Sequence, residues 1–241
     1  MLIIPIKTRV FSPPQDDIFP ALAVAARKLK EKDVLVVTSK VVAIDEGRAV
    51  PASTAAAKRR LVLSETESHT AFGGAPGVTL SLKGHAVIAS AGIDDSNGNG
   101  YWILWPKHPM RSAKKIWEFA RKKSGLKRLG IIITDSYCMP MRSGTTGISI
   151  GFYGFHPVVS HIGKRDLFGR RFIFSKSNRA DGIAAAAVGV MGETDEHIPV
   201  AIVRDIPNLV FTSRNTAREL FINPKKDIYY PILKPFHGKK K

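Results

Sequence analysis

The sequence predicts an α+β protein in which helices pack on mixed sheets, and three observations favour this class. Hydrophobic residues make up 44% of the 241 residues, with a mean hydropathy near zero, a balance typical of a soluble globular protein with a substantial core. Predicted strands follow one another as often as they alternate with helices, which argues against a regular doubly wound sheet. No repeat, low-complexity linker or composition break divides the chain.

The first elements follow from periodicity and from capping residues. Residues 2–10 alternate weakly between apolar and polar side chains and predict a strand. Residues 13–33 predict a helix, because their apolar side chains keep to one helical face. Asp16 or Asp17 can cap this helix, and Pro20 falls within its first turn, where proline is tolerated.

The middle of the chain continues with alternating element types. Residues 34–45 (VLVVTSKVVAID) predict a buried strand interrupted by polar side chains, and residues 51–68 predict a helix. Residues 73–92 predict a hairpin that is entered through a glycine-rich loop and turns at Lys83 and Gly84.

The C-terminal half has clearer signals, including an amphipathic helix closed by Gly125. An alanine-rich helix that could pack closely on a sheet follows later in the chain. The expected elements are a helix at 108–125, strands at 131–134 and 147–160, a helix at 178–191, a strand at 198–206 and a short helix at 215–221.

The apolar strand at residues 131–134 runs directly into the polar sequence DSYCMPMRSG. One interpretation is that the strand stops in a turn, where Asp135 and Ser136 satisfy backbone groups. The other is that the strand holds Asp135 rigidly and presents its carboxylate to a crevice. The residues of this stretch alone leave both interpretations open.

Composition narrows the class of protein. No apolar run approaches the ~20 residues that a membrane-spanning helix needs, and the N-terminus reads as a strand and not as a signal peptide. Cys138 is the single cysteine, so no intrachain disulfide forms and we expect a cytoplasmic location. The 37 basic residues against 20 acidic ones give a net charge of +17, which attracts nucleotides or RNA.

Familiar catalytic and nucleotide-binding signatures are missing. The chain contains no phosphate-binding loop of the G-x-x-x-x-G-K type, no complete dinucleotide fingerprint and no H-E-x-x-H zinc motif. His156 and His161 do not have a recognised ligand spacing. Cys138 has no histidine nearby in sequence to activate its thiol.

Polar residues do recur at the ends of apolar segments. Asp94, Asp135 and Glu193 each follow such a segment, and Lys40 follows another. Hard divalent cations such as Mg²⁺ take carboxylate oxygens together with substrate phosphates. The pattern therefore predicts a metal–phosphate site, with Lys40 as a phosphate partner.

Five segments in this order resemble the coenzyme F420:L-glutamate ligase family, and the resemblance covers roughly residues 2–205. They are VVTSKVVAIDEGR (36–48), SAGIDDSN (90–97), ITDSYCMPMRSG (133–144), DLFGRRF (166–172) and ADGIAAAAVGVMGETDEHIPV (180–200).

The resemblance implies a GTP-dependent ligase that adds γ-linked L-glutamate to a deazaflavin coenzyme precursor through an acyl phosphate. It further implies Mg²⁺ or Mn²⁺ at the phosphates, an F420 ligase-like α+β fold and an intertwined homodimer. We expect one ligase-like domain at residues 1–205, followed by a basic C-terminal extension at 206–241. That extension could dock on the core through Tyr229, Tyr230 and Ile232.

Site residues are carried over from the matching segments of the family. Metal ligands would be Asp94, Asp135, Ser136 and Glu193. The residues assigned to catalysis are Asp94, Asp135 and Arg142. Nucleotide binding is assigned to Lys7, Thr8, Arg9, Val10, Ser39, Lys40, Asn97, Met191, Gly192, Glu193, Thr194 and Asp195.

The chain also departs from the family pattern. Ile44 stands where the family has a lysine expected to touch the nucleotide, and residues 138–145 lack the usual arginine, tryptophan and glutamine. The acceptor therefore stays open, and a γ-glutamyl ligase acting on another cofactor such as folate is an alternative. An alternative of another class is a non-catalytic relative that binds nucleotide or RNA through its basic surface.

Overall fold

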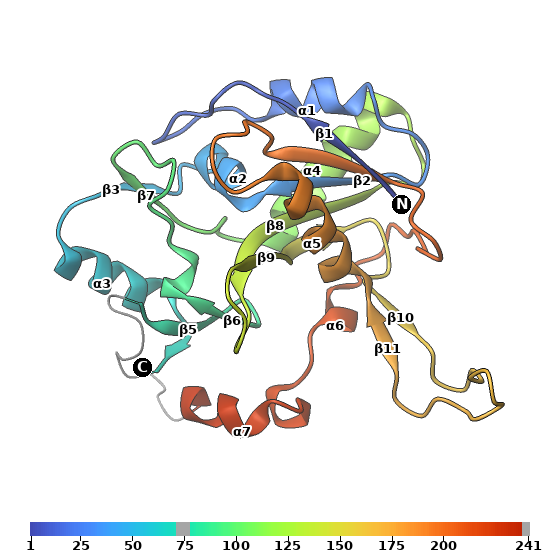
Figure 1. Cartoon of the computed structure of the whole chain (residues 1–241). Coiled ribbons are helices and arrows are strands. Elements are labelled where there is room, and N and C mark those ends of the chain that lie inside the picture. Colours follow the sequence, from blue (N-terminus) through green and yellow to red (C-terminus); the bar gives the residue numbers. More distant parts are fainter. Residues whose placement is uncertain (71–77, 238–241) are drawn as a thin grey trace.

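A five-stranded mixed sheet with helices on both faces forms the centre of the molecule (Figure 1), confirming the α+β class. The structure is a computed structural model that describes residues 1–70 and 78–237. The strands are β1 (Leu2–Ile6), β2 (Val34–Thr38), β3 (Ala49–Pro51), β4 (Ser68–His69), β5 (Leu80–Lys83), β6 (Ala86–Ala89), β7 (Tyr101–Ile103), β8 (Gly130–Cys138), β9 (Thr145–Tyr153), β10 (Val158–Ser160), β11 (Lys176–Asn178) and β12 (Val200–Arg204).

The helices connect these strands and close the chain. They are α1 (Phe19–Ala26), α2 (Ser39–Asp45), α3 (Ala55–Glu65), α4 (Pro109–Ser124), α5 (Arg179–Met191), α6 (Ala217–Leu220) and α7 (Tyr230–Leu233), with 3-10 turns η1 (Ser90–Gly92), η2 (Pro224–Lys226) and η3 (Lys234–His237). The described part of the chain contains no helix that is long and apolar enough to cross a membrane.

The central sheet has the order β1-β12-β2-β8-β9, and only β2 and β8 run parallel to each other. The side chains of β2 alternate between two core clusters. Leu35 and Val37 face the cluster that includes α1 and α4, whereas Val34 and Val36 face the cluster that includes α5. Because both faces are covered, these strands read as continuous apolar runs and not as alternating ones.

The alanine-rich helix packs closely on the sheet, as its composition predicts. Ala180, Ala184 and Ala187 of α5 are buried against the sheet. A Cβ atom built on Gly147 of β9 would lie 2.6 Å from the carbonyl oxygen of Ala184. Small residues on both elements are therefore required for this approach.

A smaller lobe beside the sheet holds α3, the pair β3–β7 and the three-stranded sheet β4-β5-β6 (Figure 1). The predicted hairpin is confirmed as β5 and β6, with its turn at Gly84 and His85 instead of Lys83 and Gly84. The glycine-rich loop expected at its start lies largely outside the described residues.

Four predicted strands differ from the structure. Residues 2–10 form β1 only as far as Ile6, and residues 147–160 divide into β9 and β10. Residues 34–45 form a strand only as far as Thr38, and Ser39 then begins α2. Helix α2 is apolar on nearly all sides because it is buried, and periodicity alone cannot distinguish such a helix from a buried strand. In addition, β8 does not stop at Thr134 but continues to Cys138, with a register shift between Ile133 and Thr134.

The C-terminal segment is anchored differently from the expectation. Tyr229 and Ile232 are 58% and 60% exposed, whereas Tyr230 is partly buried. Docking through Tyr229 and Ile232 is therefore wrong. Phe236 is buried instead, and its carbonyl oxygen accepts a hydrogen bond from Ser68 Oγ. The ring of Phe221 stacks on His85 at 4.3 Å between centroids.

We expect Phe236→Ala to release the end of the chain, since truncating a buried phenylalanine costs about 3–5 kcal/mol in a packed site. Trypsin should cleave after Lys225 or Lys226 several-fold faster in this variant. Tyr229→Ala is the matched control and should be cleaved at the parent rate, because Tyr229 is exposed. Equal cleavage of the two variants would contradict anchoring by Phe236.

Candidate active site

A cavity of about 510 Å³ opens where the carboxyl ends of the parallel strands β2 and β8 meet. Its walls come from residues 8–11 after β1, the start of α2, residues 94–99, residues 134–136 of β8 and residues 191–199 after α5. The N–H of Thr8 donates to the carbonyl of His197, and the N–H of Thr38 donates to that of Pro199. These bonds hold the walls together although they are far apart in sequence.

The Asp135 carboxyl lies at the floor of this cavity. Its Oδ1 accepts a hydrogen bond from Ser39 Oγ at 2.7 Å, and its Oδ2 accepts one from Trp105 Nε1 at 2.5 Å. Burial raises the pKa of Asp135 to about 6, although both donors and the N–H of Ser136 favour the charged form, and the nearby charge of Asp94 raises it further. Asp135 is paired with Ile148 of β9 inside a strand, so the interpretation as a turn residue is wrong.

Asp94 faces the cavity from the loop after β6. Its Oδ2 forms an ion pair with Lys40 Nζ at 2.8 Å, and its Oδ1 accepts from the N–H of Ser96 at 2.7 Å. Burial opposes ionisation of Asp94, but Lys40 and Ser96 outweigh it and hold the pKa below its ordinary value. Lys40 also donates to the carbonyl of Ser96 at 2.7 Å, which keeps the cation at the cavity wall.

The loop after α5 forms the opposite wall. Asn97 Nδ2 donates to the carbonyl of Thr194 at 2.8 Å and so links this loop to the Asp94 segment. Glu193 accepts hydrogen bonds from Ser136 Oγ at 2.7 Å and from Thr145 Oγ1 at 3.2 Å. Met191, Gly192 and Asp195 also line the cavity.

Most of the predicted site residues thus meet in one cavity, and three do not line it. Lys7 is exposed beside the lining residues Thr8, Arg9 and Val10. Ser39 is buried behind Asp135. Arg142 is exposed in the turn after β8, where its N–H donates to the carbonyl of Met139 at 3.2 Å. The structure therefore does not bring Arg142 to the two aspartates.

The four predicted metal ligands share the cavity without forming one cluster. Within residues 1–70 and 78–237, no three His, Cys, Asp or Glu side chains are grouped as a cation site. The carboxylate of Glu193 instead accepts hydrogen bonds from the hydroxyl groups of Ser136 and Thr145. Asp94 and Asp135 line the same cavity and lie close enough for the charge of Asp94 to raise the pKa of Asp135. These two carboxylates are therefore the pair that could hold a hard divalent cation.

The family pattern suggests a nucleotide contact at the position of Ile44, but this side chain packs in the core. It touches the cavity, but it is 2% exposed and belongs to the main core cluster. A lysine at this position would lose apolar packing and place an ammonium group in the core, which is costly. The structure thus gives a packing reason for isoleucine here.

Sequence reasoning missed Trp105, whose indole donates to Asp135. Trp105 follows β7 and lies 30 residues before its partner. No local pattern marks a tryptophan at that position as part of a site.

We expect Asp135→Asn to reduce the pH dependence of stability in the metal-free protein. A carboxyl whose folded pKa is raised binds its proton more tightly when folded, so the free energy of unfolding falls as pH rises from about 4 to about 6. Allowing for partial exposure, this loss is on the order of 1–2 kcal/mol. Melting temperatures at pH 4.5 and 7.5 in a chelator measure it.

Asp94→Asn is the control, because the Asp94 carboxyl stays ionised between pH 4.5 and 7.5 and the variant should keep most of the parent's pH dependence in this range. The folded pKa of Asp94 is lowered, so its contribution is present at neutral pH and disappears as pH falls through the folded pKa. The same change in pH dependence for both variants would contradict the assigned environments.

Comparisons with known proteins agree with this picture. Residues 6–205 match the family model described as F420-0:Gamma-glutamyl ligase. The chain is 33% identical to the coenzyme F420:L-glutamate ligase of Methanopyrus kandleri over 235 residues, covering 90% of this chain and 92% of the relative. It is 33% identical to that of Methanosarcina mazei, with 80% and 81% covered. It is 41% identical to that of Methanocaldococcus jannaschii, with 59% and 56% covered.

The family match covers most of the chain and includes every segment that lines the cavity. The chain belongs to the F420-0:gamma-glutamyl ligase family.

Proposed function

We propose that this protein is a GTP-driven, metal-dependent ligase that forms an amide between L-glutamate and a carboxylate acceptor of the coenzyme F420 pathway. Family membership supports a glutamate ligase. The observation that carries the finer proposal is the cavity that combines Lys40, Asp94 and Asp135 on one side with the loop after α5 on the other. Its volume of about 510 Å³ is within the ~300–1,000 Å³ typical of small-molecule sites.

The charges of the cavity suit a nucleotide triphosphate with a divalent cation. Asp94 and Asp135 would hold Mg²⁺ or Mn²⁺, which neutralises phosphate charge when it is bound. Lys40 lies beside Asp94 and would move its ammonium group onto a phosphate oxygen. Residues 8–10 and 191–195 line the cavity and can contact the nucleotide.

The reaction then needs two bond exchanges. The acceptor carboxylate attacks the γ-phosphorus of GTP, GDP leaves, and an acyl phosphate forms. The neutral amine of glutamate next attacks the acyl carbon, the amide forms, phosphate leaves and one proton is released. Catalysis of phosphoryl transfer consists mainly of positioning and charge stabilisation, which is what the Asp135 carboxylate on β8 and the Lys40 ammonium group on α2 can supply.

A second copy of the chain is proposed as a partner. The arm formed by β10, β11 and the connecting residues 161–175 projects from the body (Figure 1). Leu167 and Phe168 at its tip are 98% and 95% exposed, and Phe174 is 79% exposed. Apolar side chains presented in this way mark an interaction surface and support the homodimer that the family resemblance implies.

We expect Asp94→Asn and Asp135→Asn each to abolish acceptor-dependent GTP hydrolysis, because an amide binds Mg²⁺ poorly in place of a carboxylate. Purified protein is assayed with GTP or ATP, Mg²⁺ or Mn²⁺, L-glutamate and an acceptor. Asp205→Asn is the matched control, since Asp205 is exposed and does not line the cavity. Turnover near the parent level in both variants would remove them from the site.

The acceptor is tested in the same assay. Turnover and glutamate incorporation with the deazaflavin precursor support the proposed reaction, whereas turnover with a folate alone selects the other cofactor. Salt-sensitive retention of RNA without turnover of any nucleotide would instead select a binding protein.

We expect Phe168→Asp with Phe174→Asp to produce a monomer, because two carboxylates cannot be buried in an apolar interface without partners. Light scattering on a sizing column measures the mass. Ile228→Asp is the matched control, because Ile228 is 85% exposed but lies on the C-terminal segment and not on the arm. A monomeric parent protein, or a dimeric double variant, would contradict the role of the arm.

A further inference from the structure

Trp105 separates the cavity floor from a polar cluster in the smaller lobe. The residue is 2% exposed, and its Nε1–H donates to Oδ2 of Asp135 at 2.5 Å. Ser39 occupies the other carboxylate oxygen. With one donor on each oxygen, the remaining acceptor positions of Asp135 are restricted in direction.

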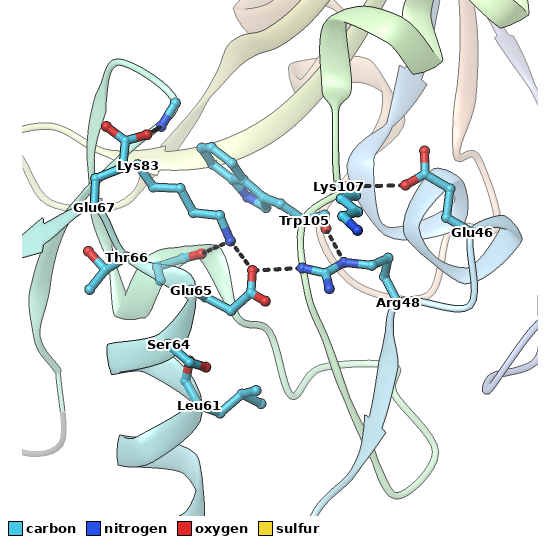
Figure 2. A network of polar contacts seen from close by, with 12 residues as sticks. Glu46, Arg48, Leu61, Ser64, Glu65, Thr66, Glu67, Lys83, Trp105 and Lys107 are labelled. Carbon is cyan, nitrogen blue, oxygen red and sulfur yellow. Dashed lines mark hydrogen bonds and ion pairs between the residues drawn. The ribbon is translucent and has the colours of Figure 1, made fainter.

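The other side of the indole is held by three charged residues (Figure 2). Lys83 Nζ lies 5.6 Å from the centre of the Trp105 ring and 2.8 Å from Glu65 Oε2. Arg48 Nη2 donates to the same Glu65 oxygen at 2.6 Å, and Arg48 Nε donates to the carbonyl of Trp105 at 3.1 Å. The side chain and the backbone of Trp105 are thus both fixed by one ion-pair cluster.

Gly92 leaves the space that the indole occupies. Its φ is +70°, and a Cβ atom built on it would lie 2.2 Å from Trp105 Nε1. Any side chain at this position would push the indole away from Asp135. The glycine that precedes the Asp94 segment therefore also permits the contact between Trp105 and Asp135.

We propose that Trp105 is a positioning residue for the Asp135 carboxylate, and that Lys83, Glu65 and Arg48 hold its indole in place. This inference rests on the proposed function, in which Asp135 binds the divalent cation. Donors that orient a metal-binding group restrict where it points and raise its affinity for the ion. The Lys83 ammonium faces the indole ring, and a cation at a ring face is attracted to it, so Lys83 keeps the ring from turning.

Trp117 provides a matched control for simple packing. It is 7% exposed, and its Nε1–H donates to the carbonyl of Leu129 at 2.8 Å. Trp117 packs between α4 and the sheet and does not line the cavity. If Trp105 served only to pack the core, Trp105→Phe would change the stability of the protein, as Trp117→Phe is expected to do. It would not change the properties of the Asp135 site.

The contact is tested first without any activity, by recording the indole N–H resonances of the ¹⁵N-labelled protein. The chain has 3 tryptophans, which Trp105→Phe and Trp117→Phe assign. The Trp105 resonance should move in Asp135→Asn and on titration of the parent protein with Mg²⁺, while the Trp117 resonance stays in place. A Trp105 resonance that is unchanged in Asp135→Asn overturns the proposal.

Binding of Mg²⁺ and GTP is then measured by calorimetry in the variants. Trp105→Phe should weaken it by about 10- to 100-fold, the usual effect of removing a donor behind a metal ligand, and Lys83→Met should weaken it less. Trp117→Phe should bind like the parent protein. Parent-like binding by Trp105→Phe overturns the proposal.

The two inferences fail in different ways. A parent protein that shows no ligase turnover contradicts the proposed function, whereas the indole resonance still decides whether Trp105 is coupled to Asp135. If Trp105→Phe does not fold, the Asp135→Asn spectrum of the intact indole and the affinity of Lys83→Met decide the question.

Discussion

Burial of the Asp135 carboxyl is the constraint on which the arrangement of the site depends. A carboxylate removed from water must recover its lost hydration through donors, and here Ser39 and Trp105 each donate to one oxygen. These donors belong to α2 and to the segment after β7. Helix α2 must therefore begin directly at the end of β2, and the chain after β7 must pass beside β8. One side chain thus ties together three parts of the fold.

Two acidic residues, Asp33 and Asp94, show how the same side chain can occupy different environments. Asp33 is fully buried, and both of its oxygens are engaged by the guanidinium of Arg204 at 2.9 and 2.7 Å. These two hydrogen bonds form a bidentate ion pair, in which both carboxylate oxygens of Asp33 have a partner. Asp94, in contrast, is paired with Lys40 on the wall of a cavity. A single ion pair at a cavity wall is easier to separate than the bidentate pair on the fully buried Asp33, and in the proposed function Lys40 would be drawn to a phosphate.

Helices with strong end signals were predictable, because capping energies act locally. Gly125 ends α4 with a φ of +72°, and Asn178 caps α5 by accepting a hydrogen bond from the N–H of Asp181. The segment at 34–45 was not predictable in the same way. Its apolar residues are buried on every side, so neither the strand period nor the helix period is visible. The change from strand to helix at Ser39 is set by the end of the sheet.

The site was predictable in part for a related reason. Asp94, Asp135 and Glu193 were identified because each follows an apolar run. Such a pattern can be recognised from a few consecutive residues. Their hydrogen-bond partners were not visible, since Trp105 lies 30 residues from Asp135, Ser39 lies 96 residues from it, and Glu193 lies 57 residues from Ser136. The exposed position of Arg142, in the turn beyond the paired strands, likewise had no local signal.

Local sequence patterns were sufficient to indicate which segments are buried, where several helices begin and end, and which carboxylates follow apolar segments. These properties depend on neighbouring residues, through periodicity, capping and local turn preferences. The parallel arrangement of β2 and β8, with their carboxyl ends at one cavity, and the contact of the Trp105 indole with Asp135 became visible only in the folded chain. Such contacts join residues that are distant in the chain, and they follow from the order of strands in the sheet, which short-range preferences do not specify.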